Sequence, residues 1–205
     1  MKGEKTMSKT IVFLGSSVTC GGDGYSMTEY VRENTPHTCI KWAVSGTTLA
    51  DIEEMSYVSH MKKEMANQDN CDLIITQLST NDAARGLPLG DVAETKDKTT
   101  FVTETITGAI EYIIASAKEK WNCPVAFYTG TKFEKPLYQQ MVDRLYDLKE
   151  KWDIDVIDLW NDEEMNAVSP EDRERYMHPD GVHPKHEGYE LWWGPKFTGY
   201  VNGVL

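Results

Sequence analysis

Residues 10–22 decide the fold, and they read TIVFLGSSVTCGG. The run from 10 to 14 is apolar or β-branched throughout, which is typical of a short strand buried on both faces of a parallel sheet. Small and hydroxyl-bearing residues follow at once. This is the pattern expected where a parallel strand ends in a loop that leads into a helix.

The same alternation continues along the chain. Further strand-like runs are predicted at 38–44, 72–78, 124–129 and 154–159. Helical stretches are predicted at 27–33, 49–65, 100–120, 136–152 and 184–200. Strands that alternate with helices predict an α/β fold, a three-layer α/β/α sandwich around a five-stranded parallel, flavodoxin-like sheet with right-handed crossovers.

Length and composition fit one globular domain. The chain has 205 residues, of which 40% are hydrophobic and 26% charged. We expect a flexible segment over 1–9 and a single domain over 10–205. The net charge of −12 disfavours nucleic acids and anionic membranes as partners. No stretch approaches the roughly 20 apolar residues of a membrane-spanning helix.

The cysteines and the first residues bear on localisation. Residues 1–9 contain lysines but no apolar run, so we expect no signal peptide. The four cysteines, Cys20, Cys39, Cys71 and Cys123, are dispersed without a CxxC pair. This spacing favours reduced thiols and a cytoplasmic protein.

Polar residues gather where the predicted strands end. GSSVTCGG occupies 15–22, SGTT occupies 45–48 and STND occupies 79–82, while HPDGVHP lies near the C-terminus at 178–184. Ligands of open parallel sheets bind at the carboxyl ends of the strands. The sequence therefore places hydroxyls, glycines, an amide, a carboxylate and an imidazole at one edge of the sheet.

These residue types suit acyl transfer. A serine becomes an effective nucleophile when an imidazole accepts its proton, and a carboxylate holds that imidazole in the right tautomer. Asp180 and His183 are three residues apart and can meet across a turn. The oxyanion needs fixed donors, which Gly46, Ser17 and Asn81 could supply.

In order and spacing, four segments resemble the motif blocks of the SGNH/GDSL hydrolase superfamily. They are FLGSSVT (13–19), AVSGTT (43–48), STND (79–82) and DGVHP (180–184). The resemblance implies a short doubly wound sandwich and a nucleophile at Ser17, not Ser16. It also implies a triad completed by Asp180 and His183, with Gly46 and Asn81 in the oxyanion hole beside the Ser17 N–H.

The chain departs from the family pattern away from those positions. Ser16 replaces the aspartate of the GDSL signature, and Ser79 replaces a common glycine. Lys41 and Thr47 stand where many members have asparagine and aspartate. None of these departures falls on an expected triad or oxyanion position.

The expected function is that of a serine esterase acting through an acyl-enzyme on Ser17, without cofactor or metal. Its expected partner is a small-molecule substrate. This is an ester with a short acyl group, such as an acetylated carbohydrate, or else a lipid ester or a thioester. The alternative is a non-catalytic flavodoxin-like module that binds a nucleotide or phosphorylated ligand. A third reading is a carbohydrate-binding protein that uses the region of Trp192 and Trp193.

Three further patterns have competing readings. His178, Asp180, His183 and His186 match no common zinc spacing. The glycines of 15–24 lack the Gly-Lys-Ser/Thr ending of a P-loop. The polar stretch 85–100 could be a lid over the pocket or a disordered loop.

Overall fold

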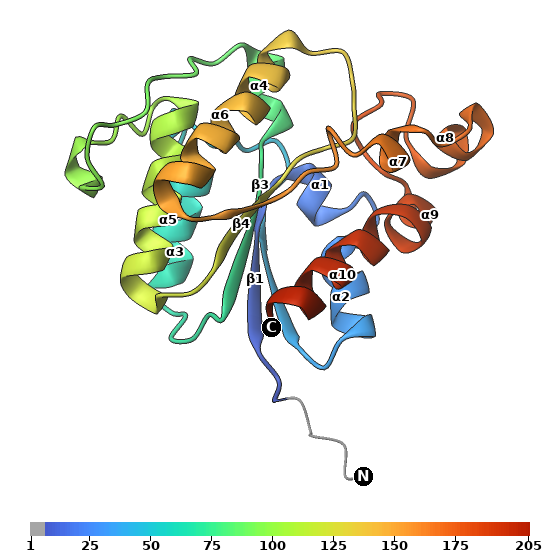
Figure 1. The fold of residues 1–205 in the computed structure, drawn as a ribbon, viewed down its shortest axis with the longest axis horizontal. Helices are drawn as coiled ribbons and strands as arrows, with labels where there is room; N and C mark the ends of the chain where they lie inside the picture. The colour runs from blue at the N-terminus through green and yellow to red at the C-terminus, as the bar shows by residue number, and fades with distance from the viewer. Residues whose placement is uncertain (1–6) are drawn as a thin grey trace.

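The computed structural model describes residues 7–205 and consists of three layers around one parallel sheet (Figure 1). The strand order is β2-β1-β3-β4-β5. The strands are β1 (Thr10–Gly15), β2 (Thr38–Ala43), β3 (Leu73–Gln77), β4 (Val125–Tyr128) and β5 (Asp155–Ile157). All neighbouring strands pair in parallel. The predicted fold class is confirmed.

Alternate residues of each strand point to opposite faces, and each face has its own core. Val12 and Leu14 pack with the helices α3 (Tyr57–Met65), α5 (Ile106–Trp121) and α6 (Pro136–Trp152). On the other face, Ile11 and Phe13 pack with α2 (Met27–Asn34) and α10 (Gly194–Val204). Figure 1 shows these two helical layers on either side of the sheet.

Several elements are single turns that the sequence pattern did not predict. They are α1 (Ser17–Cys20), α4 (Thr80–Arg85), α7 (Glu163–Asn166) and η1 (Lys98–Thr100). A longer one, α8 (Pro170–Tyr176), was also missed. The predicted C-terminal helix is instead composed of α9 (His186–Gly188), the π-helical turn η2 (Tyr189–Trp193) and α10. Periodicity has little to act on over one turn.

The helix predicted at 49–65 is wrong in its first half, since α3 begins only at Tyr57. Ser56 caps it, accepting from the Ser59 N–H. Before this cap, Leu49 and Ala50 are buried, and their N–H groups donate to the carboxylate of Asp82 at 2.8 and 3.0 Å. A buried carboxylate from α4 thus holds this apolar segment as a loop.

The segment 85–100 is neither a lid nor disordered. Its backbone is fastened to the helical layer of α5 and α6: Arg144 donates to the Gly90 oxygen, and Ala93 donates to Glu111 at 2.8 Å. Lys151 donates to the Ala93 and Thr95 oxygens. α5 also begins later than predicted, after the cap Thr105.

The aromatic residues of the terminal helix belong to the core. Trp193 and Phe197 are fully buried, and Trp192 is buried under Tyr176. Phe197 lies edge-to-face on Tyr128 of the sheet, with ring centres 5.1 Å apart. These side chains are not available as a sugar-stacking platform, so the carbohydrate-binding reading is wrong for them.

Within the described range, no helix is long and apolar enough to cross a membrane. The expected N-terminal segment 1–9 lies mostly outside the described residues, and its last member, Lys9, forms an ion pair with Asp72 at 3.0 Å. The cysteines are free thiols, although Cys71 and Cys123 lie 4.0 Å apart, sulfur to sulfur.

Candidate active site

Ser17 is the first residue of α1, directly beyond the carboxyl end of β1. The turn that places it there requires a glycine at position 15, because a Cβ at Gly15 would lie 1.8 Å from Thr19 Oγ1. The strand therefore ends in a residue that lets the following turn fold back closely onto it.

Ser16 and Ser17 point in different directions. Ser16 is fully buried, and its N–H donates to Gln77 Oε1 at 2.9 Å. Thr19 donates to the same oxygen at 2.9 Å and also contacts the Tyr128 hydroxyl. Ser17 is only partly buried, and its side chain faces the C-terminal loop. Gln77 thus fixes the turn from beneath.

His183 lies between Ser17 and Asp180. Its Nε2 is 2.7 Å from Ser17 Oγ, and its Nδ1 is 2.8 Å from Asp180 Oδ2. Because a carboxylate only accepts, Nδ1 carries the proton, and Nε2 is left to accept from the serine hydroxyl. The structure brings together these three residues from opposite ends of the chain.

Asp180 is held by its own loop. The N–H groups of Val182 and His183 donate to Oδ1 at 2.8 and 3.0 Å. Partial burial raises the pKa of Asp180, but these bonds and the His183 ring outweigh it and leave the pKa below its ordinary value. The carboxylate is therefore ionised at neutral pH and holds the imidazole in orientation.

Gly46 and Asn81 lie in the two neighbouring loops. Gly46 has a φ of +84°, which favours glycine, and its carbonyl accepts from Arg85 at 2.9 Å. Asn81 donates one amide hydrogen to the Thr47 oxygen at 2.8 Å. Its second amide hydrogen and the N–H groups of Gly46 and Ser17 have no acceptor among residues 7–205. These N–H groups are free to donate hydrogen bonds to an oxygen that develops negative charge.

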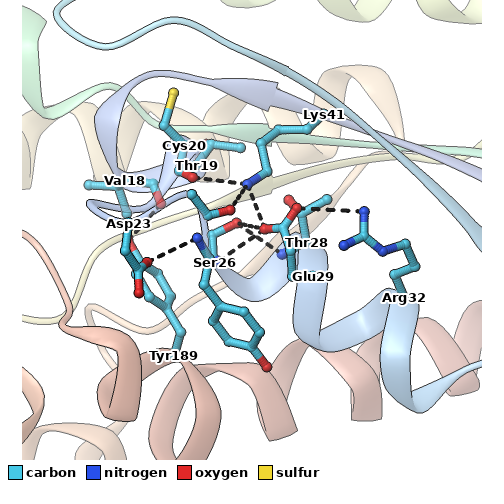
Figure 2. A network of polar contacts seen from close by, with 12 residues as sticks. Val18, Thr19, Cys20, Asp23, Ser26, Thr28, Glu29, Arg32, Lys41 and Tyr189 are labelled. Atoms are coloured by element: carbon cyan, nitrogen blue, oxygen red, sulfur yellow. Dashed lines mark hydrogen bonds and ion pairs between the residues drawn. The ribbon is translucent and has the colours of Figure 1, made fainter.

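Lys41 supports the loop that follows Ser17 (Figure 2). From β2, its ammonium donates to the Cys20 oxygen at 2.9 Å and the Gly24 oxygen at 3.0 Å. It also pairs with Glu29 at 2.5 Å, and that carboxylate accepts from the N–H and Oγ of Ser26 at the start of α2. One cation thus joins the end of α1, the loop and the next helix.

Two contacts join this loop to the C-terminal segment. Tyr189 donates its hydroxyl to the Val18 oxygen at 2.7 Å. His186 lies 2.7 Å from Asp23 and stacks on Tyr25, with ring centres 4.1 Å apart. The segments that carry Ser17 and His183 are therefore connected beyond the contact between those two residues.

A cavity of about 510 Å³ opens beside His183. Its walls come from α4, from the loop before α6, from α8 and from the loop 179–183. Asn81, Asp180 and His183 line it, together with Ala84 and Phe133. No residue of 85–100 contributes to the lining. The volume suits a small organic ligand.

Sequence reasoning missed several supporting residues of this site. The STND motif does not reveal the role of Asp82, whose buried carboxylate accepts from the N–H groups of Leu49 and Ala50, and burial raises the pKa of this carboxyl. Gln77 lies within the strand predicted at 72–78 and belongs to none of the motifs. A polar residue at the end of an otherwise apolar strand was the available signal.

No group of three or more potential metal ligands gathers anywhere in 7–205.

Comparison with known families decides the assignment. The sequence profile of the GDSL-like Lipase/Acylhydrolase family matches residues 13–191. The chain belongs to this family. It is accordingly an ester hydrolase of the SGNH serine type, as the sequence motifs predicted, and a non-catalytic flavodoxin-like module is not favoured. No protein of curated function matches the chain in sequence.

Solved structures share the fold of this GDSL-family chain over nearly its whole length. A Lactobacillus plantarum protein has a TM-score of 0.73 and 17% identity, covering 97% of this chain and 99% of its own. A Bacteroides ovatus protein described as a GDSL-like lipase has a TM-score of 0.69 and 19% identity, and the match covers 96% of this chain and 99% of that protein. An acetyl xylan esterase, AlAXEase, has a TM-score of 0.67 and 16% identity, and the match covers 94% of this chain and 99% of that protein.

Proposed function

We propose that this GDSL-family hydrolase cleaves short-acyl carboxylic esters through an acyl-enzyme on Ser17. The observation that carries the proposal is the pair of contacts from Ser17 Oγ to His183 Nε2 and from His183 Nδ1 to Asp180, at 2.7 and 2.8 Å. A hydroxyl, an imidazole and a carboxylate in this order form a nucleophile with its base and the group that orients the base.

In the first step, His183 takes the hydroxyl proton while Ser17 Oγ attacks the acyl carbonyl carbon. The oxyanion receives hydrogen bonds from the N–H groups of Ser17 and Gly46 and from the Asn81 amide. Collapse expels the alcohol, which is protonated by His183, and leaves the acyl group on Ser17. Water, deprotonated by His183, then releases the acid. Asp180 stabilises the imidazolium in both halves.

Two observations support a small substrate such as an acetylated carbohydrate. The cavity beside His183 is about 510 Å³, within the size range of sites that bind small organic ligands. One protein with the same fold is an acetyl xylan esterase. Lipid esters and thioesters are tested as separate arms of the experiment.

The experiment measures hydrolysis of p-nitrophenyl esters from acetate to decanoate, and of acetyl-CoA, with fluorophosphonate labelling and peptide mapping in parallel. We expect the highest kcat/KM for acetate and an adduct on Ser17. Ser17→Ala should lose both activity and label, whereas Ser16→Ala, altered at the neighbouring buried hydroxyl, should keep most of each. Full activity in Ser17→Ala would refute the mechanism, and a maximum at decanoate would refute the substrate class.

A further inference from the structure

The cavity beside His183 carries an unusual group of positive charges. Lys132 and Lys135, from the loop before α6, and Arg173, from α8, all line it. The lysines are exposed and Arg173 is partly buried. The protein as a whole has a net charge of −12, so a cavity lined by three cations differs in charge from the protein as a whole.

These three side chains differ from many other cations of the protein in lacking an acidic partner. Within the described chain, none of the three forms an ion pair. The lysines and arginines that do form ion pairs are not part of the cavity lining. The paired residues are Lys9, Arg32, Lys41, Lys62, Arg85, Lys98, Arg144, Lys151, Arg175 and Lys196. None of the three cations at the cavity is therefore neutralised by a direct ion pair within residues 7–205.

Arg173 has most of its hydrogen-bonding capacity unused. Its Nη2 donates to the Lys132 oxygen at 2.9 Å, which fixes the guanidinium between two walls of the cavity. A guanidinium has five N–H donors in a planar fork that matches the oxygens of a carboxylate or a phosphate. Among residues 7–205, the one hydrogen bond found for this partly buried arginine goes to a carbonyl, which leaves its other N–H donors available to an anion from outside the protein.

The acidic residues of the lining do not cancel this charge. Asp180 is engaged by His183 and by two backbone N–H groups. Glu134 is exposed and lies between the two lysines in the loop sequence. The three cations outnumber the two acidic residues of the lining, so the charge of the cavity favours a negatively charged ligand.

We propose that this cavity binds an anionic group, a carboxylate or a phosphate, carried by the ester substrate itself, with Arg173 as its main ligand. Lys132 and Lys135 add attraction at the rim. The proposal rests on the ester hydrolase function proposed above, because it assigns the far end of the same substrate. Focused positive potential would also draw anionic esters to a protein whose net charge repels them.

The test uses two acetate esters that differ in one charge, 4-acetoxyphenylacetate and its uncharged amide. The methylene group keeps the charge away from the phenolic leaving oxygen, so the leaving groups are equivalent. At low ionic strength the wild type should favour the acid in kcat/KM by about tenfold or more, as expected for a charge-assisted pair. A third substrate, 2-(4-acetoxyphenyl)ethyl phosphate, distinguishes phosphate from carboxylate preference.

The variants change the same charge at different places. Arg173→Gln should lower the acid-to-amide ratio about tenfold, and Lys132→Gln with Lys135→Gln should lower it less. The second variant involves exposed side chains only, so it remains informative if Arg173→Gln folds poorly. Lys149→Gln, exposed on α6 and outside the cavity, should leave the ratio unchanged.

Four results would overturn the proposal. A wild-type ratio near one, or a ratio that Arg173→Gln leaves intact, would reject the anion site while Ser17-dependent hydrolysis of the amide still upheld the esterase. An equal fall in Lys149→Gln would assign the preference to net charge alone. Failure to cleave any ester would reject the proposed function and the anion site with it.

Discussion

Asn81 illustrates how one side chain can serve both structure and chemistry. One amide hydrogen holds the Thr47 carbonyl, and the other is free at the site. We expect Asn81→Ala to lower kcat by about 10²–10³-fold with a smaller change in KM, because an oxyanion donor acts mainly in the transition state. Steady-state kinetics on p-nitrophenyl acetate, with a melting curve to verify folding, would check this. A change confined to KM would contradict it.

The lowered pKa of Asp180 leads to a prediction for the acid side of the pH profile. Its pKa lies below the ordinary value of 3.8, so its interaction with His183 is present above that pH and is lost only as the pH falls through the lower, folded-state pKa. Protonation of Asp180 should therefore contribute nothing to the acid limb of kcat/KM between neutrality and about pH 4, so the limb should not exceed unit slope in that range. A slope of two in that range would show that Asp180 titrates there.

Single residues could be predicted where a motif names them, but not where their role arises from a distant contact. The sequence pointed to Ser17, Asp180 and His183, and the fold brings these three within hydrogen-bonding distance. Their chemical roles stay predictions. Gln77 stands out as a polar residue in an apolar strand, but its contact with Ser16 could not be predicted, nor could that of Arg85 with Gly46, because each joins residues far apart in sequence.

At the scale of elements, the loop after Ser17 depends on Lys41. Lys41→Met would remove a cation from two carbonyls and leave Glu29 without it, so α1 should lose its fixed position. We expect kcat on p-nitrophenyl acetate to fall roughly 10- to 100-fold, since small misplacements of a nucleophile are costly.

The matched control is Arg32→Met. Arg32 approaches the same carboxylate, Glu29, at 3.8 Å, but its side chain is half exposed and touches neither carbonyl of the loop. This variant should keep nearly full activity. If both variants lost activity equally, the effect would come from Glu29 and not from support of the loop.

Element boundaries were predictable where the sequence carries its own stop and start signals. The helix at 136–152 has its predicted bounds, with Pro136 at its first position and an apolar stripe along it. The helix predicted from position 49 failed because Leu49 and Ala50 look helical but donate their N–H groups to Asp82 across the fold. Tertiary contacts override local pattern there.

On the scale of the whole molecule, the C-terminal helix closes one face of the sheet. Phe197 is fully buried against Tyr128, whereas Leu191 in the preceding turn is 50% exposed. Phe197→Ala should lower the free energy of unfolding by about 3–5 kcal/mol and the melting temperature by roughly 10 °C. Leu191→Ala should change the former by less than about 0.5 kcal/mol. Calorimetry or urea unfolding would check both, and equal losses would contradict this packing.

The layered architecture, by contrast, could be inferred from general rules once the alternation of strands and helices was read. Right-handed crossovers leave few arrangements for five parallel strands. The path of 85–100 could not be inferred, because its attachment to α5 and α6 depends on Arg144 and Lys151 reaching backbone oxygens more than fifty positions away.

The 166 positions that separate Ser17 from His183 also have a consequence during synthesis. At about 5–20 residues per second, a ribosome needs roughly 8–33 s to add the second after the first. Throughout that interval the nascent chain carries the proposed nucleophile without its base. A polypeptide terminated before His183 is then inert, and reactivity toward a fluorophosphonate becomes a signal that translation has passed that residue.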